Sequence, residues 1–303
     1  MNRLLFVTLS NIGDLVMTTP ALVAMHDAYP DARIDIVADL RSSELLSRCP
    51  FLGDLVHRVK QDGKTGMLKL VRTLRARRYE AIVDLRTDFL PWLLRAHRRS
   101  ARWQARDYGP HAVEQHFAVA ARVLPSPRPI PATRIWLSAA DREQACVRLA
   151  SLPGTRRLIV APGANWPGKR WPLEHYTALA NLLREDFDSL ILLGNAADAA
   201  DGERMLSRLH LPTLNLMGRT SLIEATAVLE QGLLFVGNDS GLGHLAAAAG
   251  VRGVTLFGPG RPARYRPWGT NATVVMAPGL VLDQLQPATV AAHVQGRLRE
   301  DAA

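Results

Sequence analysis

The sequence predicts an α/β protein of two doubly wound domains with parallel sheets, and three observations support this. Short apolar runs alternate with amphipathic stretches along the whole chain, as in βαβ units whose sheet is covered on both faces. The 303 residues are enough for two domains of ordinary size. A proline-rich segment, Pro125 to Pro131, interrupts the alternation, which then restarts.

The first domain is expected to span residues 1–130. Its apolar runs are short enough for buried strands, and the stretches between them have the length of helices. The expected elements are a strand at 3–9, a helix at 15–28, a strand at 33–38, a helix at 66–78 and a strand at 81–85. The charged residue Asp14 ends the first apolar run before it is long enough for the core of a signal peptide. The run is therefore interpreted as a strand.

The second domain is expected to span residues 131–303, after the extended proline spacer. The expected strands are 158–161, 189–193, 213–216, 233–236 and 254–257. The expected helices are 138–152, 173–184, 198–209, 222–231, 242–249 and 287–300, of which the last could pack back on the first domain. Two such domains would face each other across a cleft, with ligands bound at the carboxyl ends of the strands.

Composition limits the classes of protein that this chain can be. Apolar residues make up 48% and charged residues 21%, no apolar run reaches membrane-spanning length, and there are two cysteines, so a cytoplasmic globular protein is expected. The net charge is +9, and ten arginines between Arg72 and Arg106 face only three acidic residues. Such a segment attracts glycolipid phosphates, an acidic membrane surface or nucleic acid, unless it is simply a solvated surface.

The first candidate loop, residues 10–14, lies between the first strand and the first helix. It has one glycine, Gly13, where a dinucleotide-binding turn would have three, so a simple dehydrogenase is disfavoured. Asp14 falls in the first turn of the helix, where the helix dipole favours an ionised carboxylate. Asp14 is therefore a candidate general base, and the alternative is a capping aspartate.

The second candidate loop, residues 161–172, is rich in glycine and ends in a cationic pair before a helix. Backbone amides and a point charge in such a loop suit a phosphate group. The chain has 33 arginines and four lysines, and Lys169 is the only lysine after Lys69. A lysine in this loop therefore indicates a need for a compact ammonium group, although a surface lysine is the alternative.

The third candidate loop runs from Val236 to His244, and its glycines let a ligand approach the backbone at the start of a helix. This arrangement predicts a diphosphate site, with Asp239 as an alternative helix cap and His244 as an alternative packed histidine. Two weaker loops could contact a nucleoside: one places Asp198 where it could bind ribose, and the other carries Thr220. Helix capping is the alternative for both. The spacings that metal sites, hydrolase elbows and P-loops require are absent from the sequence, so no protein-bound metal is expected.

Taken together and in this order, the motifs resemble those of glycosyltransferase family 9, the ADP-heptose:lipopolysaccharide heptosyltransferases. The resemblance covers essentially the whole chain. It is carried by the segments Asn11-Ile12-Gly13-Asp14, Thr19-Pro20-Ala21, Lys169 to Pro172, Asn238 to Gly241 with His244, and Leu256 to Pro259. It implies a GT-B fold, in which the N-terminal domain holds the acceptor and the C-terminal domain holds the sugar nucleotide.

The resemblance also implies roles for individual residues. Asp14 would be the general base, and Lys169 would neutralise the departing diphosphate. Asn165 and Asp198 stand where relatives have a hydroxyl residue and a glutamate, respectively. The donor-binding residues would be Gly13, Asn165, Gly194, Asp198, Thr220, Asp239, Ser240, Gly241 and His244.

The implied reaction transfers a heptose from ADP-heptose to a hydroxyl of the lipopolysaccharide inner core, with inversion at the anomeric carbon and without a cofactor. An acceptor of the lipid A and Kdo kind is anionic, so arginines 72 to 106 could steer it and hold the enzyme at the inner membrane. Three alternatives remain open: a sugar-nucleotide epimerase or hydrolase, a heptosyltransferase with a protein acceptor, and a non-catalytic nucleotide or nucleic-acid binder. The last is disfavoured because few aromatic residues accompany the arginines, so no nucleic-acid partner is expected.

Overall fold

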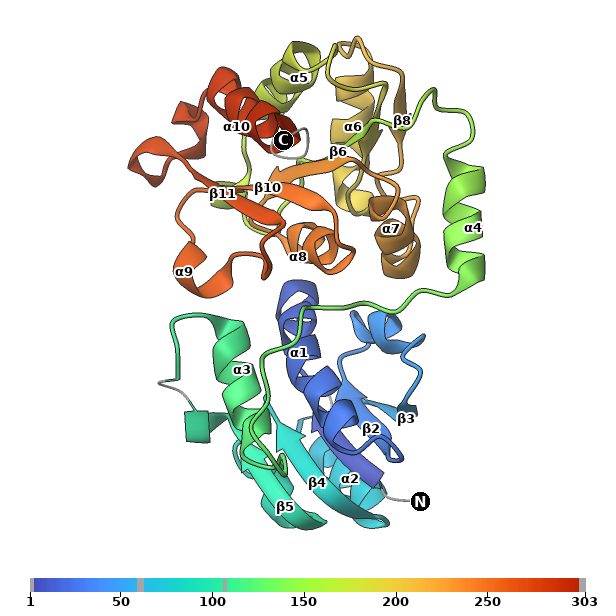
Figure 1. Cartoon of the computed structure of the whole chain (residues 1–303), viewed down its shortest axis with the longest axis vertical. Coiled ribbons are helices and arrows are strands. Elements are labelled where there is room, and N and C mark those ends of the chain that lie inside the picture. Colours follow the sequence, from blue (N-terminus) through green and yellow to red (C-terminus); the bar gives the residue numbers. More distant parts are fainter. Residues whose placement is uncertain (1–2, 59–62, 106–107, 300–303) are drawn as a thin grey trace. The chain divides into compact units, whose positions relative to one another are not determined.

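The computed structural model describes residues 3–58, 63–105 and 108–299. The chain divides into two compact units, Met1–Trp136 and Leu137–Ala303, whereas the sequence predicted a boundary after residue 130. Each unit contains one parallel sheet flanked by helices (Figure 1). The prolines that follow residue 126 lie in a segment, 127–138, without helix or strand, because alternate prolines remove donors that either structure needs.

The N-terminal unit has a five-stranded sheet in the order β3-β2-β1-β4-β5. Its strands are β1 (Arg3–Val7), β2 (Arg33–Ala38), β3 (Leu52–His57), β4 (Arg78–Asp84) and β5 (Arg95–Ala101). Its helices are α1 (Ile12–Ala28), α2 (Gly63–Arg75) and α3 (Ala112–Ala121), with the 3₁₀ turns η1 (Ser43–Leu46), η3 (Leu90–Leu93) and η4 (Arg102–Ala105). The strand order reverses between β1 and β4, so a ligand site is expected at their carboxyl ends.

Helix α1 is continuous through Pro20, although proline cannot donate the hydrogen bond that the carbonyl four residues earlier would accept. That carbonyl belongs to Val16, and Thr19 Oγ1 donates to it at 2.7 Å. The neighbouring Thr18 hydroxyl bonds Thr8 Oγ1 at 2.8 Å, which ties the helix to the end of β1. The two threonines therefore hold the helix on which Asp14 is presented.

The sequence did not predict β3, β5 or α3. Strand β5 is an edge strand with the sequence RAHRRSA, and most of its arginines are exposed. An edge strand with solvated side chains lacks the apolar run by which buried parallel strands are recognised. Helix α3 packs beside α1, as Figure 1 shows.

The C-terminal unit has a six-stranded sheet in the order β11-β10-β9-β6-β7-β8. Its strands are β6 (Arg157–Ala161), β7 (Ser189–Leu192), β8 (Thr213–Asn215), β9 (Leu234–Asn238), β10 (Arg252–Phe257) and β11 (Ala272–Met276). Its helices are α4 (Ala139–Arg148), α5 (Leu173–Leu182), α6 (Ala199–Leu206), α7 (Leu222–Leu229), α8 (Gly241–Ala248), α9 (Pro262–Tyr265) and α10 (Pro287–Arg299). The short turns η5 (Pro167–Lys169) and η6 (Ala196–Asp198) follow β6 and β7.

In this second sheet the order reverses between β6 and β9, and the loops after both strands are among those that the sequence selected. The predicted strands and helices of this unit are confirmed in type and order, and β11 and the short helix α9 were missed. Helix α10 packs against α5 in the core of its own unit through Val290, Ala291 and Val294. Glu300, at the end of the helix predicted for 287–300, lies outside the described residues.

Within the described ranges, no helix is both long enough and apolar enough to cross a lipid bilayer. Both cysteines are free thiols, with Cys49 buried and Cys146 exposed. Burial raises the pKa of Cys49 to about 12, so this thiol is protonated at neutral pH.

Candidate active site

Gly13 and Asp14 lie in the first turn of α1, directly after β1, as their spacing predicted. Asp14 is partly exposed, and its Oδ2 accepts a hydrogen bond from Asn11 Nδ2 at 2.9 Å. Asn11 occupies the N-cap position, but its side chain makes no capping hydrogen bond to the backbone. It bonds the Asp14 carboxylate instead. The Asp14 carboxylate therefore lies at the N-terminal end of α1, partly open to solvent.

Asp84 ends β4 at the switch point of the same sheet and is fully buried. Its Oδ1 accepts two backbone hydrogen bonds, from Arg86 at 2.9 Å and from Thr87 at 2.7 Å, and the Thr87 hydroxyl donates to Oδ2. Burial raises the pKa of Asp84, and these hydrogen bonds offset part of that effect. Asp84 therefore shapes the loop after β4.

Arg86, on that loop, belongs to a basic cluster with Arg41 and Arg58 at the ends of β2, β3 and β4. Its side chain is 11% exposed, its Nη2 is 3.6 Å from Asp39 Oδ2, and its Nη1 is buried without a hydrogen-bond partner in the described part of the chain. Burial lowers the pKa of Arg86, and the nearby Arg58 and Arg41 act in the same direction. An anionic group fits a buried, unfilled guanidinium donor among other cations.

In the C-terminal unit, the loops after β6 and β9 meet through Lys169 and Asp239. Lys169 Nζ donates to Asp239 Oδ2 at 2.5 Å. The Lys169 side chain is 32% exposed and that of Asp239 is 9% exposed, so the ammonium group is the more accessible partner. The sequence singled out both residues as donor-binding or catalytic but did not predict this ion pair.

The start of α8 lies beside this pair, because Ser240 and Gly241 follow Asp239 directly. Ser240 is the N-cap residue, yet its side chain makes no capping bond, and its buried Oγ has no hydrogen-bond partner among the residues described. The Ser240 hydroxyl therefore does not cap the first-turn amides of α8. These amides and the hydroxyl can each donate a hydrogen bond to the oxygens of an anion. His244 lies one turn further on and is buried, as its packed alternative requires.

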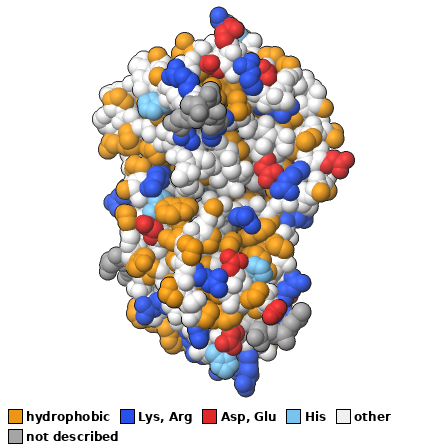
Figure 2. Space-filling model, viewed as in Figure 1, with side chains coloured by type: hydrophobic (Ala, Val, Ile, Leu, Met, Phe, Trp, Pro, Cys, Tyr) orange, Lys and Arg blue, Asp and Glu red, His pale blue; other side chains and the backbone are white. Residues whose placement is uncertain are grey.

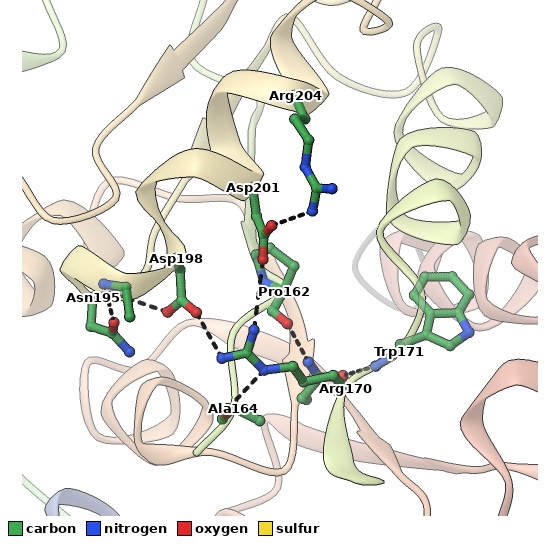
Figure 3. A network of polar contacts seen from close by, with 10 residues as sticks. Pro162, Ala164, Arg170, Trp171, Asn195, Asp198, Asp201 and Arg204 are labelled. Atoms are coloured by element: carbon green, nitrogen blue, oxygen red, sulfur yellow. Dashed lines mark hydrogen bonds and ion pairs between the residues drawn. The ribbon is translucent and has the colours of Figure 1, made fainter. Parts of the chain in front are cut away.

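Asp198 is held from several sides, as Figure 3 shows. Its Oδ1 accepts from Arg170 Nη2 at 3.1 Å, and its Oδ2 accepts from the backbone amide of Asn195 at 3.1 Å. Arg170 Nε also donates to the Ala164 carbonyl at 2.9 Å. A Cβ at Gly163 would lie 2.3 Å from Asp198 Oδ2, so only glycine lets the loop pass over the carboxylate. Arg170 thus links the loop after β6 to the loop after β7.

Asn238, the last residue of β9, is fully buried and makes three hydrogen bonds. Its Oδ1 accepts from the Trp171 amide at 3.1 Å and from Tyr176 Oη at 2.9 Å, and its Nδ2 donates to the Pro162 carbonyl at 2.6 Å. These partners lie on both sides of Lys169 in the sequence. Asn238 therefore binds both ends of the lysine-bearing loop to the sheet. The sequence did not predict this role, although Asn238 precedes Asp239 in the glycine-rich motif.

The remaining predicted residues lie in neighbouring loops. The amide of Gly218 donates to the Gly194 carbonyl at 3.0 Å, which joins the loops after β7 and β8. Thr220 is partly exposed just before the cap of α7, and Asn165 is exposed in the loop after β6. The described residues bring together no group of three or more histidine, cysteine or acidic side chains that could hold a metal ion.

The fold and these motifs agree with the proteins to which the chain is similar. Lipooligosaccharide heptosyltransferase 2 of Haemophilus influenzae is 30% identical, over 90% of this chain and 88% of that protein. The solved structure of E. coli ADP-heptose lps heptosyltransferase II has a TM-score of 0.82 and 27% identity, with all of both chains covered. A glycosyl transferase family 9 structure from Veillonella parvula has a TM-score of 0.86 at 20% identity, covering 99% of this chain and 97% of that one.

The family model described as glycosyltransferase family 9 (heptosyltransferase) matches residues 67–281. Together with the relative that is 30% identical over nine tenths of the chain, this match covers both structural units. The GT-B fold expected from the sequence is confirmed by the structural likeness. The chain therefore belongs to glycosyltransferase family 9 and is a glycosyltransferase.

Proposed function

We propose that this enzyme transfers a heptose from ADP-heptose to a hydroxyl group of the lipopolysaccharide inner core, with inversion at the anomeric carbon. The observation that carries the proposal is the Lys169–Asp239 ion pair beside the start of α8, where the buried Ser240 Oγ has no hydrogen-bond partner in the described part of the chain. A cation, backbone amides and a hydroxyl group together match the diphosphate of a sugar nucleotide. The names of the relatives support the choice of heptose and of lipopolysaccharide.

The donor is proposed to lie along the carboxyl ends of β6 to β9. Lys169, Ser240 and the amide of Gly241 would hold the diphosphate, and Asp239 would bind hydroxyl groups of the sugar. Asp198 would contact the ribose and Thr220 would lie near the adenine. Gly13, Asn165, Gly194 and His244 complete the proposed donor contacts.

In the proposed reaction, a hydroxyl oxygen of the acceptor attacks the anomeric carbon as the bond from that carbon to the ADP oxygen breaks. Attack from the face opposite to ADP inverts the configuration. Asp14 takes the hydroxyl proton, and Lys169 together with the amides of α8 stabilises the charge that develops on ADP. The charge on ADP is thus assigned to protein groups, and we expect the reaction to need no protein-bound metal.

The acceptor is proposed to be an anionic glycolipid of the lipid A and Kdo kind. The buried Nη1 of Arg86 has no hydrogen-bond partner among the residues that the structure describes. Arg86 and the neighbouring Arg58 would hold a carboxylate or phosphate group of the acceptor. Arginines 72 to 106 would hold the enzyme at the cytoplasmic face of the inner membrane, although Arg106 lies outside the described residues.

Release of ADP from ADP-heptose, measured with and without lipid A that carries Kdo, tests the proposal. We expect release that depends on the acceptor, a product heavier by one heptose, and the same rate when EDTA is present. Equal release without any acceptor would show a hydrolase, and an isomerised sugar nucleotide would show an epimerase. Transfer to a protein but not to the glycolipid would overturn the choice of acceptor.

A further inference from the structure

A group of exposed apolar side chains on the N-terminal unit has no part in the proposed reaction. It consists of Phe89, Trp92, Leu93, Trp103 and Tyr108, here called the aromatic platform, with exposures of 76%, 48%, 49%, 48% and 61%. These are five of the fourteen large apolar side chains found exposed in the described residues, and they fall within 20 residues of sequence. Isolated exposed apolar residues are normal, whereas such a concentration marks an interaction surface.

The platform is one surface because its two halves are in contact. The rings of Trp92 and Trp103 are stacked, with centroids 6.0 Å apart and planes 27° apart. Arg102 Nε donates to Asp88 Oδ1 at 2.9 Å, which joins η4 to the segment before η3. Trp103 and Tyr108 line one pocket of about 540 Å³. The aromatic rings are therefore neighbours in space as well as in sequence.

The outward position of these side chains is built into the turn η3. Leu90 and Leu94 are buried and belong to the same apolar cluster as Leu70 and Leu74 of α2. Between them in sequence, Trp92 and Leu93 are about half exposed. Leu90 and Leu94 therefore pack η3 against the core, while Trp92 and Leu93 stay exposed to solvent.

The surroundings of the platform are strongly basic. Exposed cations on the contacting helix α2 and on β5 and η4 are Lys69, Arg72, Arg75, Arg95, Arg98 and Arg102. Asp88, which lies just before η3 in the sequence, forms an ion pair with Arg102. In the view of Figure 2, hydrophobic side chains are interspersed with Lys and Arg on the N-terminal unit. The surface therefore combines aromatic rings with an excess of positive charge.

We propose that the aromatic platform is a membrane-interface anchor that inserts its rings at the headgroup level of an anionic bilayer. Tryptophan and tyrosine rings are amphipathic and prefer this level, where one part of the ring meets acyl chains and the other meets water. The surrounding arginines are complementary to anionic headgroups. Charge complementarity selects a bilayer with acidic lipids over an uncharged apolar partner, and neither basic charge nor aromatic rings alone would hold the protein firmly.

The inference rests on the membrane association given under the proposed function and deepens it by naming the side chains that insert. It can fail separately from the proposed reaction, because binding to vesicles is measured without donor or acceptor. The full chain is floated with vesicles of phosphatidylethanolamine and phosphatidylglycerol, and separately with phosphatidylcholine. The test variant combines Phe89→Ser, Trp92→Ser and Leu93→Ser. The control combines Val147→Ser and Leu182→Ser, which are exposed to 72% and 54% on the other unit.

We expect the wild type and the control to bind anionic vesicles, and the test variant to bind them at least about tenfold more weakly. Added salt should weaken the binding of the wild type without abolishing it. A second readout uses brominated lipids, which should quench the tryptophan fluorescence of the wild type. The Trp92→Phe, Trp103→Phe double variant should keep its binding to vesicles but show much less quenching.

Equal binding by the test variant and the wild type, or complete loss of wild-type binding in salt, would show that arginines alone act and would overturn the anchor. Self-association of the wild type in place of vesicle binding would also overturn it. Circular dichroism and the melting temperature of the test variant exclude misfolding, and the tryptophan-to-phenylalanine variant keeps the test decisive if the triple variant fails to fold. Acceptor-dependent ADP release by the same variants reports separately on the proposed function.

Discussion

Lys169 Nζ donates to Asp239 Oδ2 at 2.5 Å, across the loops that follow β6 and β9. The two strands are neighbours at the point where the strand order reverses, so their carboxyl ends bring the two residues together. Asp239 neutralises the ammonium group when no anion is present, and a bound diphosphate would compete for the same three N–H donors. The pair thus holds Lys169 where the leaving group is proposed to develop its charge.

Replacement of Lys169 by alanine should lower kcat more than it raises the KM for the donor. The ammonium group is proposed to act on charge that develops as ADP departs, so it contributes more to the transition state than to the bound substrate. Initial rates at several ADP-heptose concentrations separate the two constants. Lys169→Arg, which keeps the charge but not the compact geometry, is the control. An unchanged kcat with a raised KM would instead assign Lys169 to donor binding alone.

Replacement of Asp14 by asparagine should lower kcat by about 100-fold to 10,000-fold, the range of general-base catalysis. Asparagine can still pair with Asn11, the residue that contacts Asp14 in the structure, so the helix start should persist. Calorimetric titration with ADP should show donor-site affinity unchanged, because the loss concerns proton transfer. Activity within a few-fold of the wild type would leave Asp14 as a residue of the helix start without a catalytic role.

Much of the architecture could be predicted from the sequence because both sheets are parallel and buried. Their inner strands are continuous apolar runs, and their glycine-rich loops fall where β6 and β9 end. The predictions failed for strands whose side chains are solvated. Strand β5 is an arginine-rich edge strand, so it has no apolar pattern by which it could be recognised. The proline spacer was recognised because proline restricts the backbone whatever its neighbours are.

Contacts within the candidate site could not be predicted in the same way. Residue type and spacing placed Asp198 at a loop-to-helix junction, but its pairing with Arg170 depends on how two loops fold over each other at Gly163. The same holds for Asn238, whose three partners are spread over 15 residues of another loop and helix. Pairings between distant loops follow from three-dimensional packing, which a single sequence does not specify.

Arg170 and Asp198 should be energetically coupled. Asp198 is 1% exposed and both its oxygens accept hydrogen bonds, so Arg170→Gln leaves a buried carboxylate with its charge uncompensated. In a double-mutant cycle with Asp198→Asn, the free energies of unfolding should deviate from additivity by about 0.5 to 3 kcal/mol. Denaturant unfolding gives these values, and the KM for ADP-heptose measured on the same four proteins reports on the proposed ribose contact. Strict additivity would contradict the coupling.

Loss of the Asn238 side chain should destabilise the C-terminal unit and misplace Lys169. Asn238→Ala leaves the Trp171 amide and the Tyr176 hydroxyl buried without their acceptor, at a cost of about 1 to 3 kcal/mol for each. Tyr176→Phe removes one of these bonds together with its donor, so it should cost only about 0.5 to 1.5 kcal/mol. At a temperature where both variants are folded, kcat should fall in Asn238→Ala and stay near the wild-type value in Tyr176→Phe. A shared loss of kcat would mean that packing around Tyr176, and not the amide clip, positions the loop.

The stability of the N-terminal unit should fall as the pH rises through the titration of Asp84. Burial raises the pKa of Asp84 above its ordinary value of 3.8, so the folded state binds this proton more tightly than the unfolded state does. Its contribution to stability is therefore fully present below pH 3.8 and is lost as the pH passes the raised value. Asp84→Asn, which can still accept both backbone hydrogen bonds on its Oδ1, removes this titration. The difference in free energy of unfolding between wild type and variant, measured by urea denaturation from pH 4 upwards, should shift in favour of the variant as the pH rises. A difference that does not change with pH, or one that changes in the opposite direction, would contradict the raised pKa.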